Sequence, residues 1–261
     1  MSGSKWLIGE LRRLRESAGL TQEAWGTKLH FSTSHVGAVE RGERPALPDY
    51  LHAVDKVFGT TLLAFYREHI RGEWAPSWYR PFIDYENRAT LLRIYQPNLV
   101  PGLLQTEDYA RALLQALNVG PGELDPTLAA RLDRQDLVTR AASPCRLAVV
   151  LDESSLRRCV GGGEVMRDQL KALAEAGDRT NVQIHVVPLA TPAYVGLLGP
   201  LVLAAVEGRT IGYLEGHLEG RVIESPEAVT DLEVIWEAVR AYALPCAQSQ
   251  ELMMKVGETW T

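Results

Sequence analysis

The chain has 261 residues, of which 46% are hydrophobic and 23% charged, and its formal net charge is −6. This length and composition suffice for about two globular domains and exclude a disordered or low-complexity chain. The longest apolar stretch, residues 197–206, is interrupted by Gly199 and Pro200 and is far shorter than the roughly 20 residues of a membrane span. The charged N-terminal residues do not resemble a secretory leader, and three widely spaced cysteines favour neither disulfides nor zinc. We therefore expect a cytoplasmic protein with no cofactor, no metal site and no membrane partner.

Charge divides the chain into two parts. Residues 1–72 hold ten Lys/Arg and eight Asp/Glu, whereas the remaining residues hold 17 and 25. A mildly basic segment followed by an acidic one indicates two parts with different partners. Pro76 and Pro81 break any helix between them. We therefore predict a first domain over residues 1–72 and a second domain over residues 73–261.

Apolar spacing predicts five short helices in the first domain. Apolar residues recur at helical intervals over residues 7–18, and Gly19 ends that helix. Thr21 and Ser32 are suitable N-caps for a second and a third helix. Two further helices follow, the last ending near His69. Two helices joined by so short a turn, within about 70 residues, predict a helix-turn-helix domain.

Two strings of residues in this domain keep a recognisable spacing, Leu11-x-x-Leu14-Arg15-x-x-x-Gly19-Leu20-Thr21-Gln22-Glu23 and Ser32-x-Ser34-x-Val36-x-x-Val39-Glu40-Arg41-Gly42. They resemble the lambda-repressor/Cro (XRE-type) DNA-binding domains. The resemblance implies that Glu40 pairs with Arg15 inside the fold. His30 stands where that family often has Gly or Asn, so we expect a histidine in a left-handed backbone conformation.

The third helix supplies the candidate contacts to DNA bases. Its leading end would enter the major groove and present Ser32, Thr33 and Ser34, with Ala38 one turn further on. Hydroxyl groups pair with many bases, and an alanine reaches only a thymine methyl group. Direct readout is therefore thin, and we expect DNA shape to contribute to specificity.

Candidate phosphate contacts flank that helix. Gln22 begins the second helix, where a phosphate meets free amide groups, and Arg41 and Arg44 follow the third. His35 either contacts a phosphate or is simply exposed. Arg12 and Arg13 are expected on a solvated face of the first helix.

The second domain has the pattern of an α+β domain around a mixed sheet. Short apolar runs predict strands and longer amphipathic segments predict helices. We expect helices over residues 84–95, 106–117, 125–140, 153–159, 164–176 and 225–242 and from residue 247. Strands are expected over residues 146–151, 182–188, 201–206, 210–214 and 221–224.

Two strings in this domain are unusual, Val100-Pro101-Gly102-Leu103-Leu104-Gln105-Thr106-x-x-Tyr109-Ala110-Arg111-Ala112 and Asp152-Glu153-x-x-Leu156-Arg157-Arg158-x-Val160-Gly161-Gly162. They resemble the C-terminal domain of unknown function of a family of bacterial antitoxin-like regulators, over roughly residues 74–258. The resemblance implies an XRE-type domain ahead of it and a small partner protein. It implies no mechanism.

The sequence offers no complete set of catalytic residues. Residues 161–163 are three glycines before a helix but lack both the G-x-G-x-x-G pattern and a P-loop lysine. Asp152 is interpreted as the cap of the following helix, and His185 as a satisfied residue of a strand. Residues 215–219 surround a histidine with acids, which is a weak metal motif, and we favour a solvated hairpin as its interpretation. We therefore expect neither catalytic residues nor enzymatic activity.

Aromatic side chains gather at the junction of the two domains, over residues 74–95. Trp78 and Tyr95 could line an effector pocket with Arg80 or Gln105 as its polar anchor. Packing of these aromatic residues in the core is the alternative.

These features together predict a transcription regulator. We expect a homodimer that binds an inverted repeat in double-stranded DNA, because the two-fold symmetry of a dimer matches two half-sites. The second domain would dimerise and respond to a small-molecule effector or a protein partner. The alternatives are an antitoxin that sequesters a small protein, and an enzyme with a vestigial DNA-binding domain.

Overall fold

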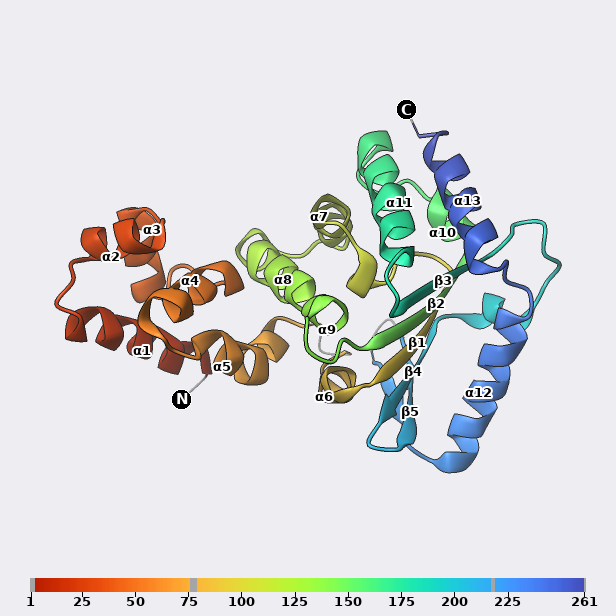
Figure 1. The fold of residues 1–261 in the computed structure, drawn as a ribbon, viewed down its shortest axis with the longest axis horizontal. Helices are drawn as coiled ribbons and strands as arrows, with labels where there is room; N and C mark the ends of the chain where they lie inside the picture. Colours follow the sequence, from red (N-terminus) through yellow and green to blue (C-terminus); the bar gives the residue numbers. More distant parts are fainter. Residues whose placement is uncertain (1–2, 76–78, 217–218, 261) are drawn as a thin grey trace. The chain divides into compact units, whose positions relative to one another are not determined.

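A computed structural model describes residues 3–75, 79–216 and 219–260 (Figure 1). The chain forms two compact units, Met1–Ala75 with Pro121–Asp133 and Pro76–Gly120 with Arg134–Thr261. We term their described residues the helical unit and the sheet unit. Residues 121–133, which the sequence places in the second domain, therefore belong to the helical unit. Among the described residues, no helix is long and apolar enough to span a bilayer.

The helical unit contains the five predicted helices, a short 3-10 helix and one helix from later in the chain. Trp25, Val36 and Tyr50 lie at the centre of its apolar core. The indole Nε1 of Trp25 donates a hydrogen bond to the hydroxyl of Tyr50 at 2.9 Å, so these two buried polar groups satisfy each other. The elements are α1 (Gly3–Ser17), α2 (Gln22–Leu29), α3 (Thr33–Glu40), α4 (Pro48–Phe58), α5 (Leu62–His69), η1 (Arg71–Trp74) and α8 (Pro121–Asp133).

Helix α8 corrects the prediction of a helix over residues 125–140. It begins four residues earlier, includes Pro126 in its interior and ends at Asp133. Burial explains this, because Pro126 and Leu128 are both buried and their packing offsets the hydrogen bond that a proline cannot donate. The guanidinium of Arg67 adds hydrogen bonds of 2.8 and 2.9 Å to Asp133, whose side chain is 3% exposed. A buried ion pair thus ties α8 to the helical unit.

The sheet unit is an α+β domain with a six-stranded mixed sheet. Its strands are β1 (Leu91–Gln96), β2 (Arg146–Asp152), β3 (Val182–Val187), β4 (Leu201–Val206), β5 (Arg209–Leu214) and β6 (Arg221–Ile223), in the order β3-β2-β1-β4-β5-β6. Strands β1, β2 and β3 are parallel, and the other pairings are antiparallel. The helices are α6 (Arg80–Arg88), η2 (Gly102–Leu104), α7 (Glu107–Ala116), α9 (Asp136–Thr139), α10 (Glu153–Arg157), α11 (Gly163–Gly177), η3 (Val195–Leu198), α12 (Pro226–Arg240) and α13 (Cys246–Gly257).

Each face of the sheet has its own apolar core. Leu92 and Ile94 of β1 pack with residues of α6, α7, α11 and α13 on one face. Tyr95 packs with Val150 and Trp236 on the other face, which α12 covers (Figure 1). The sheet unit is therefore a three-layer arrangement in which α12 covers one side of the sheet.

Strand β1 corrects the predicted helix over residues 84–95. Helix α6 ends at Arg88, and β1 begins three residues later. β1 lies between β2 and β4 and is buried on both faces, so its apolar residues do not alternate with polar ones. Leu92 and Tyr95 lie three residues apart because they serve opposite cores, and that spacing imitates a helix.

Candidate nucleic-acid interface

Local hydrogen bonds fix the turn between α2 and α3. The hydroxyl of Thr21 accepts the backbone N–H of Ala24, and the hydroxyl of Ser32 accepts that of His35, both at 3.1 Å. His30 has φ 63° and ψ 35°, the left-handed conformation expected for it. Because the caps satisfy N–H groups that a helix start leaves unpaired, both helices begin where the sequence predicts.

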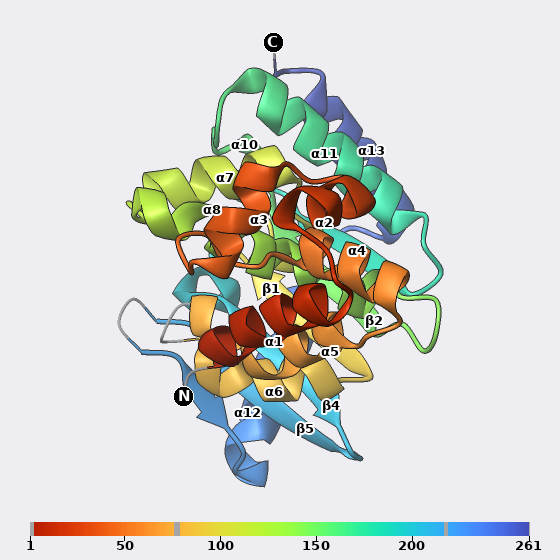
Figure 2. The ribbon, with the colours of Figure 1, turned by 90° about the vertical axis from the view of Figure 1, so that its left-hand side faces the viewer.

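A glycine permits the close approach of α2 to the turn. A Cβ atom at Gly26 would lie 2.5 Å from the carbonyl oxygen of Phe31 and 3.3 Å from a methyl group of Val36. A larger residue there would push the turn and α3 away from α2. Figure 2 shows α2, α3 and α4 grouped together in the helical unit. The position of α3 is thus set by its packing on α2.

The leading end of α3 is polar and exposed. Ser32, Thr33 and Ser34 are exposed, whereas Val36 behind them is fully buried and Ala38 is half-buried. The hydroxyl of Ser32 accepts the cap hydrogen bond and keeps its own proton for another acceptor. The structure therefore brings together the three hydroxyl groups that the sequence assigns to base contacts.

A buried ion pair joins α3 to α1. The guanidinium of Arg15 donates to both carboxylate oxygens of Glu40, at 2.6 and 3.0 Å, as the XRE resemblance implied. The amide of Gln22 donates to the same carboxylate at 2.9 Å. Burial raises the pKa of Glu40, but the hydrogen bonds from Arg15 and Gln22 outweigh this effect and hold that pKa below its ordinary value. Glu40 therefore remains an anion inside the unit.

Two residues of this region make contacts that the sequence did not predict. Gln22, expected to hold a phosphate, donates one of the two N–H groups of its amide to Glu40, and its contact with a phosphate stays a prediction. Arg12 is exposed, as expected, and its guanidinium also donates to the backbone carbonyl of Glu40 at the C-terminus of α3, where a helix favours positive charge. Arg13 is exposed and pairs with Glu10.

The two candidate phosphate ligands after α3 differ in their charge environment. The guanidinium of Arg41 bonds to the exposed carboxylate of Glu43 at 2.7 and 2.8 Å, which raises the pKa of Arg41. In the described part of the chain, no carboxylate forms an ion pair with Arg44. Of these two arginines, Arg44 is therefore the more available to a phosphate, because Glu43 already compensates the charge of Arg41.

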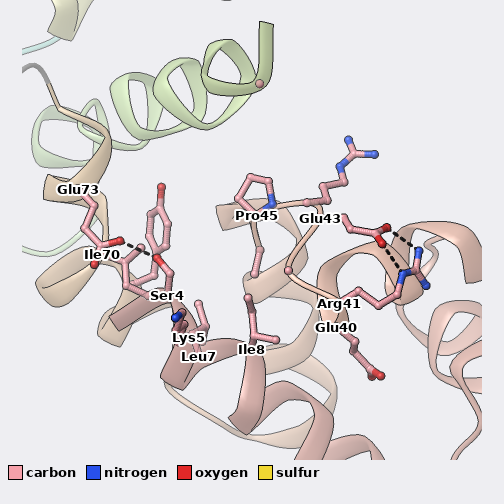
Figure 3. A pocket seen from close by; sticks show the side chains of 15 residues that line it. Ser4, Lys5, Leu7, Ile8, Glu40, Arg41, Glu43, Pro45, Ile70 and Glu73 are labelled. Carbon is pink, nitrogen blue, oxygen red and sulfur yellow. Dashed lines mark hydrogen bonds and ion pairs between the residues drawn. The ribbon is translucent and has the colours of Figure 1, made fainter. Parts of the chain in front are cut away.

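The loop that carries these arginines lies beside a cavity of about 660 Å³ within the helical unit. Figure 3 shows Pro45 on the loop side and Ile8 and Ile70 among the other lining residues. The hydroxyl of Ser4 donates to the carboxylate of Glu73 at 2.6 Å at the edge of this cavity. Part of the loop after α3 therefore borders this cavity and does not pack against the apolar core there.

His35 is only partly exposed, so simple exposure does not describe it, and its contact with a phosphate stays a prediction. Its ring contacts those of Phe31 and Tyr50, with centroid distances of 4.8 and 5.2 Å. Its Nε2 is buried and has no hydrogen-bond partner among the described residues. Burial lowers the pKa of His35, and the nearby charge of Arg44 adds to this effect. His35 is therefore a residue of α3 whose neutral ring packs against Phe31 and Tyr50, a role that its spacing of four residues from Phe31 could have indicated.

This neutral histidine predicts loss of stability on acidification. Because the pKa of His35 is lower in the folded chain than its ordinary 6.5, the unfolded chain takes up the proton first. Its contribution is complete above pH 6.5 and is lost as the pH falls through the folded-state pKa. We expect His35→Phe to lose less thermal stability than the wild type between about pH 8 and about pH 5, measured by circular dichroism. Exposed His52, replaced by Gln, is the control, and equal pH dependence in all three chains would contradict the prediction.

The predicted aromatic pocket is not present in the described residues. Tyr95 is fully buried in the core beneath α12, where its hydroxyl lies 2.8 Å from that of Tyr194. Gln105 is buried and donates to the carbonyl of Val100, which belongs to the core on the opposite face. Arg80 is exposed, and Trp78 lies outside the described residues. The side chains are separated because β1 directs successive residues to opposite faces, so core packing is the correct interpretation of Tyr95 and Gln105.

Other predicted structural roles agree with the structure. Asp152 caps α10 by accepting the N–H of Ser154 at 2.8 Å. The Nδ1 of His185 lies 2.9 Å from the carbonyl oxygen of Leu244, so this strand histidine is satisfied. Gly161 has φ 73° in the turn before α11. His217 of the weak metal motif lies outside the described residues.

Two protein-family models match the chain. A helix-turn-helix domain matches residues 6–64, which contain most of α1, the whole of α2 to α4 and the start of α5. A domain of unknown function (DUF5753) matches residues 79–255, which contain the whole sheet. No curated protein matches the chain. The helix-turn-helix match indicates a DNA-binding domain, and both matches agree with the resemblances seen in the sequence.

Proposed function

Since this chain belongs to the family of the domain of unknown function (DUF5753) and carries a helix-turn-helix domain ahead of it, we propose that it is a transcription regulator that binds specific sequences in double-stranded DNA. The main support is the exposed leading end of α3, where Ser32, Thr33 and Ser34 present hydroxyl groups on a helix packed firmly against α2. A helix held in this way enters the major groove with its N-terminal residues at the base edges.

We further propose that the protein acts as a homodimer on an inverted repeat and that its sheet unit receives the controlling signal. A two-fold dimer places two copies of α3 about one turn of DNA apart, at roughly 34–36 Å. Only three hydroxyl groups and Ala38 face the bases, so part of the specificity would come from DNA shape. No enzymatic step forms part of this function.

Arg44→Ala is expected to weaken DNA binding and its salt dependence. The loss of one phosphate contact lowers the slope of log affinity against log salt concentration by about 0.9. Arg41→Ala is expected to have the smaller effect, because Glu43 already neutralises Arg41. The measurement is fluorescence anisotropy at several salt concentrations, with a duplex selected from random sequences by the purified full chain.

Arg13→Ala is the matched control, because Arg13 is an exposed arginine that pairs with Glu10 on α1. Its slope should equal that of the wild type. An unchanged slope in Arg44→Ala would contradict the assignment of Arg44. Failure of the full chain to select any duplex, even at low ionic strength, would contradict the proposed function itself.

A further inference from the structure

A second cavity lies wholly within the sheet unit and is rich in arginine. It has a volume of about 330 Å³ and lies where β1, β2 and β3 begin, on the face that α12 covers. Its lining includes Arg93, Arg146 and Arg240 and only one acidic residue, Glu237. We term it the arginine groove. Such a concentration of positive charge is notable, because the chain beyond residue 72 holds 25 acidic and only 17 basic residues.

The register of the sheet brings the polar side chains of the groove together. Leu91 pairs with Arg146, and Arg93 pairs with Ala148, which in turn pairs with Gln183. Because paired residues on neighbouring strands share a face, Arg93, Arg146 and Gln183 all point toward α12. Arg240 comes from the last turn of that helix. The three arginines thus come from two strands and one helix and line the same cavity.

The hydrogen-bonding capacity of these arginines is only partly used inside the chain. One terminal nitrogen of Arg93 donates to the carboxylate of Glu233 at 2.8 Å. Its Nε is buried and has no acceptor in the described part of the chain, which is costly for a charged donor. Among the described residues, no carboxylate forms an ion pair with Arg146 or Arg240. The groove therefore offers donors to a ligand that brings its own acceptors.

The arrangement favours a phosphate group over a carboxylate. One guanidinium fork can satisfy both oxygens of a carboxylate, whereas three guanidiniums from different directions match the several oxygens of a tetrahedral phosphate. Asn181 and Gln183 line the same cavity and add neutral hydrogen-bonding groups. A volume of about 330 Å³ lies at the lower end for small-molecule sites, so a phosphate with a small organic group fits and a polymer does not.

We propose that the arginine groove binds the phosphate group of a small phosphorylated molecule and, resting on the DNA-binding function proposed above, that this molecule is the effector. The probes are inorganic phosphate and glycerol 3-phosphate, with acetate at equal ionic strength as the comparison. Binding to the full chain is measured by isothermal titration calorimetry. We expect both phosphates to bind and acetate not to bind. Acetate binding as strong as that of the two phosphates would overturn the assignment.

Variants test the location of the site. Arg146→Ala and Arg240→Ala are each expected to weaken phosphate binding about tenfold, the effect of losing one charged hydrogen bond. Arg93→Lys keeps the charge but removes the fork, and it should weaken binding as well. Arg158→Ala, an exposed arginine of the same unit outside the groove, is the matched control. Wild-type affinity in the chain with both Arg146→Ala and Arg240→Ala would overturn the proposal.

DNA binding in the same variants separates this proposal from the one on which it rests. Without phosphate, the variants are expected to bind the selected duplex like the wild type, because the groove lies outside the helical unit. Glycerol 3-phosphate should change the DNA affinity of the wild type and not that of the double variant. DNA binding without any phosphate binding would overturn the groove and leave the regulator intact. Phosphate binding that never alters DNA affinity would overturn the effector role.

Discussion

Replacement of Arg15 by methionine is expected to lower the free energy of unfolding of the helical unit by about 3–5 kcal/mol, the cost of breaking a buried ion pair. Glu40 is 4% exposed, and its carboxylate would keep the hydrogen bond from Gln22 and the longer ion pair with Arg12 at 3.9 Å. The guanidinium also donates to the carbonyl of Leu20 at 2.8 Å, and that bond is lost as well. Methionine retains most of the aliphatic volume, so the effect measures the lost charge and hydrogen bonds.

Urea denaturation and DNA binding of the full chain are the two measurements. Arg13→Met is the control and should change stability by less than about 1 kcal/mol, because exposed ion pairs contribute little. Addition of Glu40→Leu to Arg15→Met should recover most of the stability, since an apolar pair of similar volume often replaces a buried ion pair without loss. A loss in Arg15→Met no larger than in Arg13→Met would refute the structural role of the pair.

Acid titration gives an independent check of the same pair. The pKa of Glu40 lies below its ordinary 4.5 in the folded chain, so its contribution is present above pH 4.5 and disappears as the pH falls through the lower value. The wild type is therefore expected to lose this contribution on acidification. The chain with Arg15→Met and Glu40→Leu has no such contribution to lose, and its stability should fall less steeply.

The helix-turn-helix was predictable because its determinants are local. Thr21, Ser32 and the left-handed His30 each act within a few residues, and the structure places all three as expected. The partners of Glu40 were different, since they come from α1 and α2. Only a known family pattern indicated Arg15, and nothing in the sequence indicated that Gln22 and Arg12 would join it.

The sheet unit shows where sequence patterns fail. Strand β1 contributes side chains to the apolar cores on both faces of the sheet. The spacing of Leu92 and Tyr95, which lie in different cores, therefore indicated a helix. Arg93 of the same strand lines the arginine groove. The groove forms because the register of β1 and β2 places their arginines on the face of the sheet that α12 covers. Long-range pairing of this kind leaves no periodic signal along the chain. The sequence therefore gave no indication that the arginines of the groove lie near one another.

A second buried ion pair allows the sheet unit to be weakened separately. The guanidinium of Arg134 donates to both oxygens of Glu86 at 2.6 and 2.8 Å, and one of its nitrogens also lies 2.7 Å from the hydroxyl of Tyr79. Glu86 is 1% exposed. Burial raises the pKa of Tyr79 well above its ordinary value, so the phenol keeps its proton and donates it to Glu86. The carboxylate thus depends on two donors, of which only Arg134 carries a charge.

Arg134→Met is expected to destabilise the sheet unit by about 3–5 kcal/mol, because it leaves a buried carboxylate without its counter-charge. The loss also includes the contact between the guanidinium carbon of Arg134 and the ring of Tyr79, at 4.4 Å from the centroid. Urea denaturation is again the measurement. Arg88→Met is the control. It removes an exposed ion pair with Asp84 on the same helix as Glu86 and should lower the free energy of unfolding by less than about 1 kcal/mol.

The two variants together test how function is divided between the units. Arg15→Met should reduce DNA binding and leave phosphate binding unchanged, because the arginine groove lies in the sheet unit. Arg134→Met should reduce phosphate binding because it unfolds the sheet unit. Binding of DNA by α3 should persist in this variant, because α3 belongs to the helical unit. If Arg134→Met destroyed DNA binding as completely as Arg15→Met, the sheet unit would be required to hold the DNA-binding form, and dimerisation through that unit would be the physical reason. Analytical sedimentation of the Arg134→Met chain tests this explanation. If the sheet unit forms the dimer, this variant should sediment as a monomer.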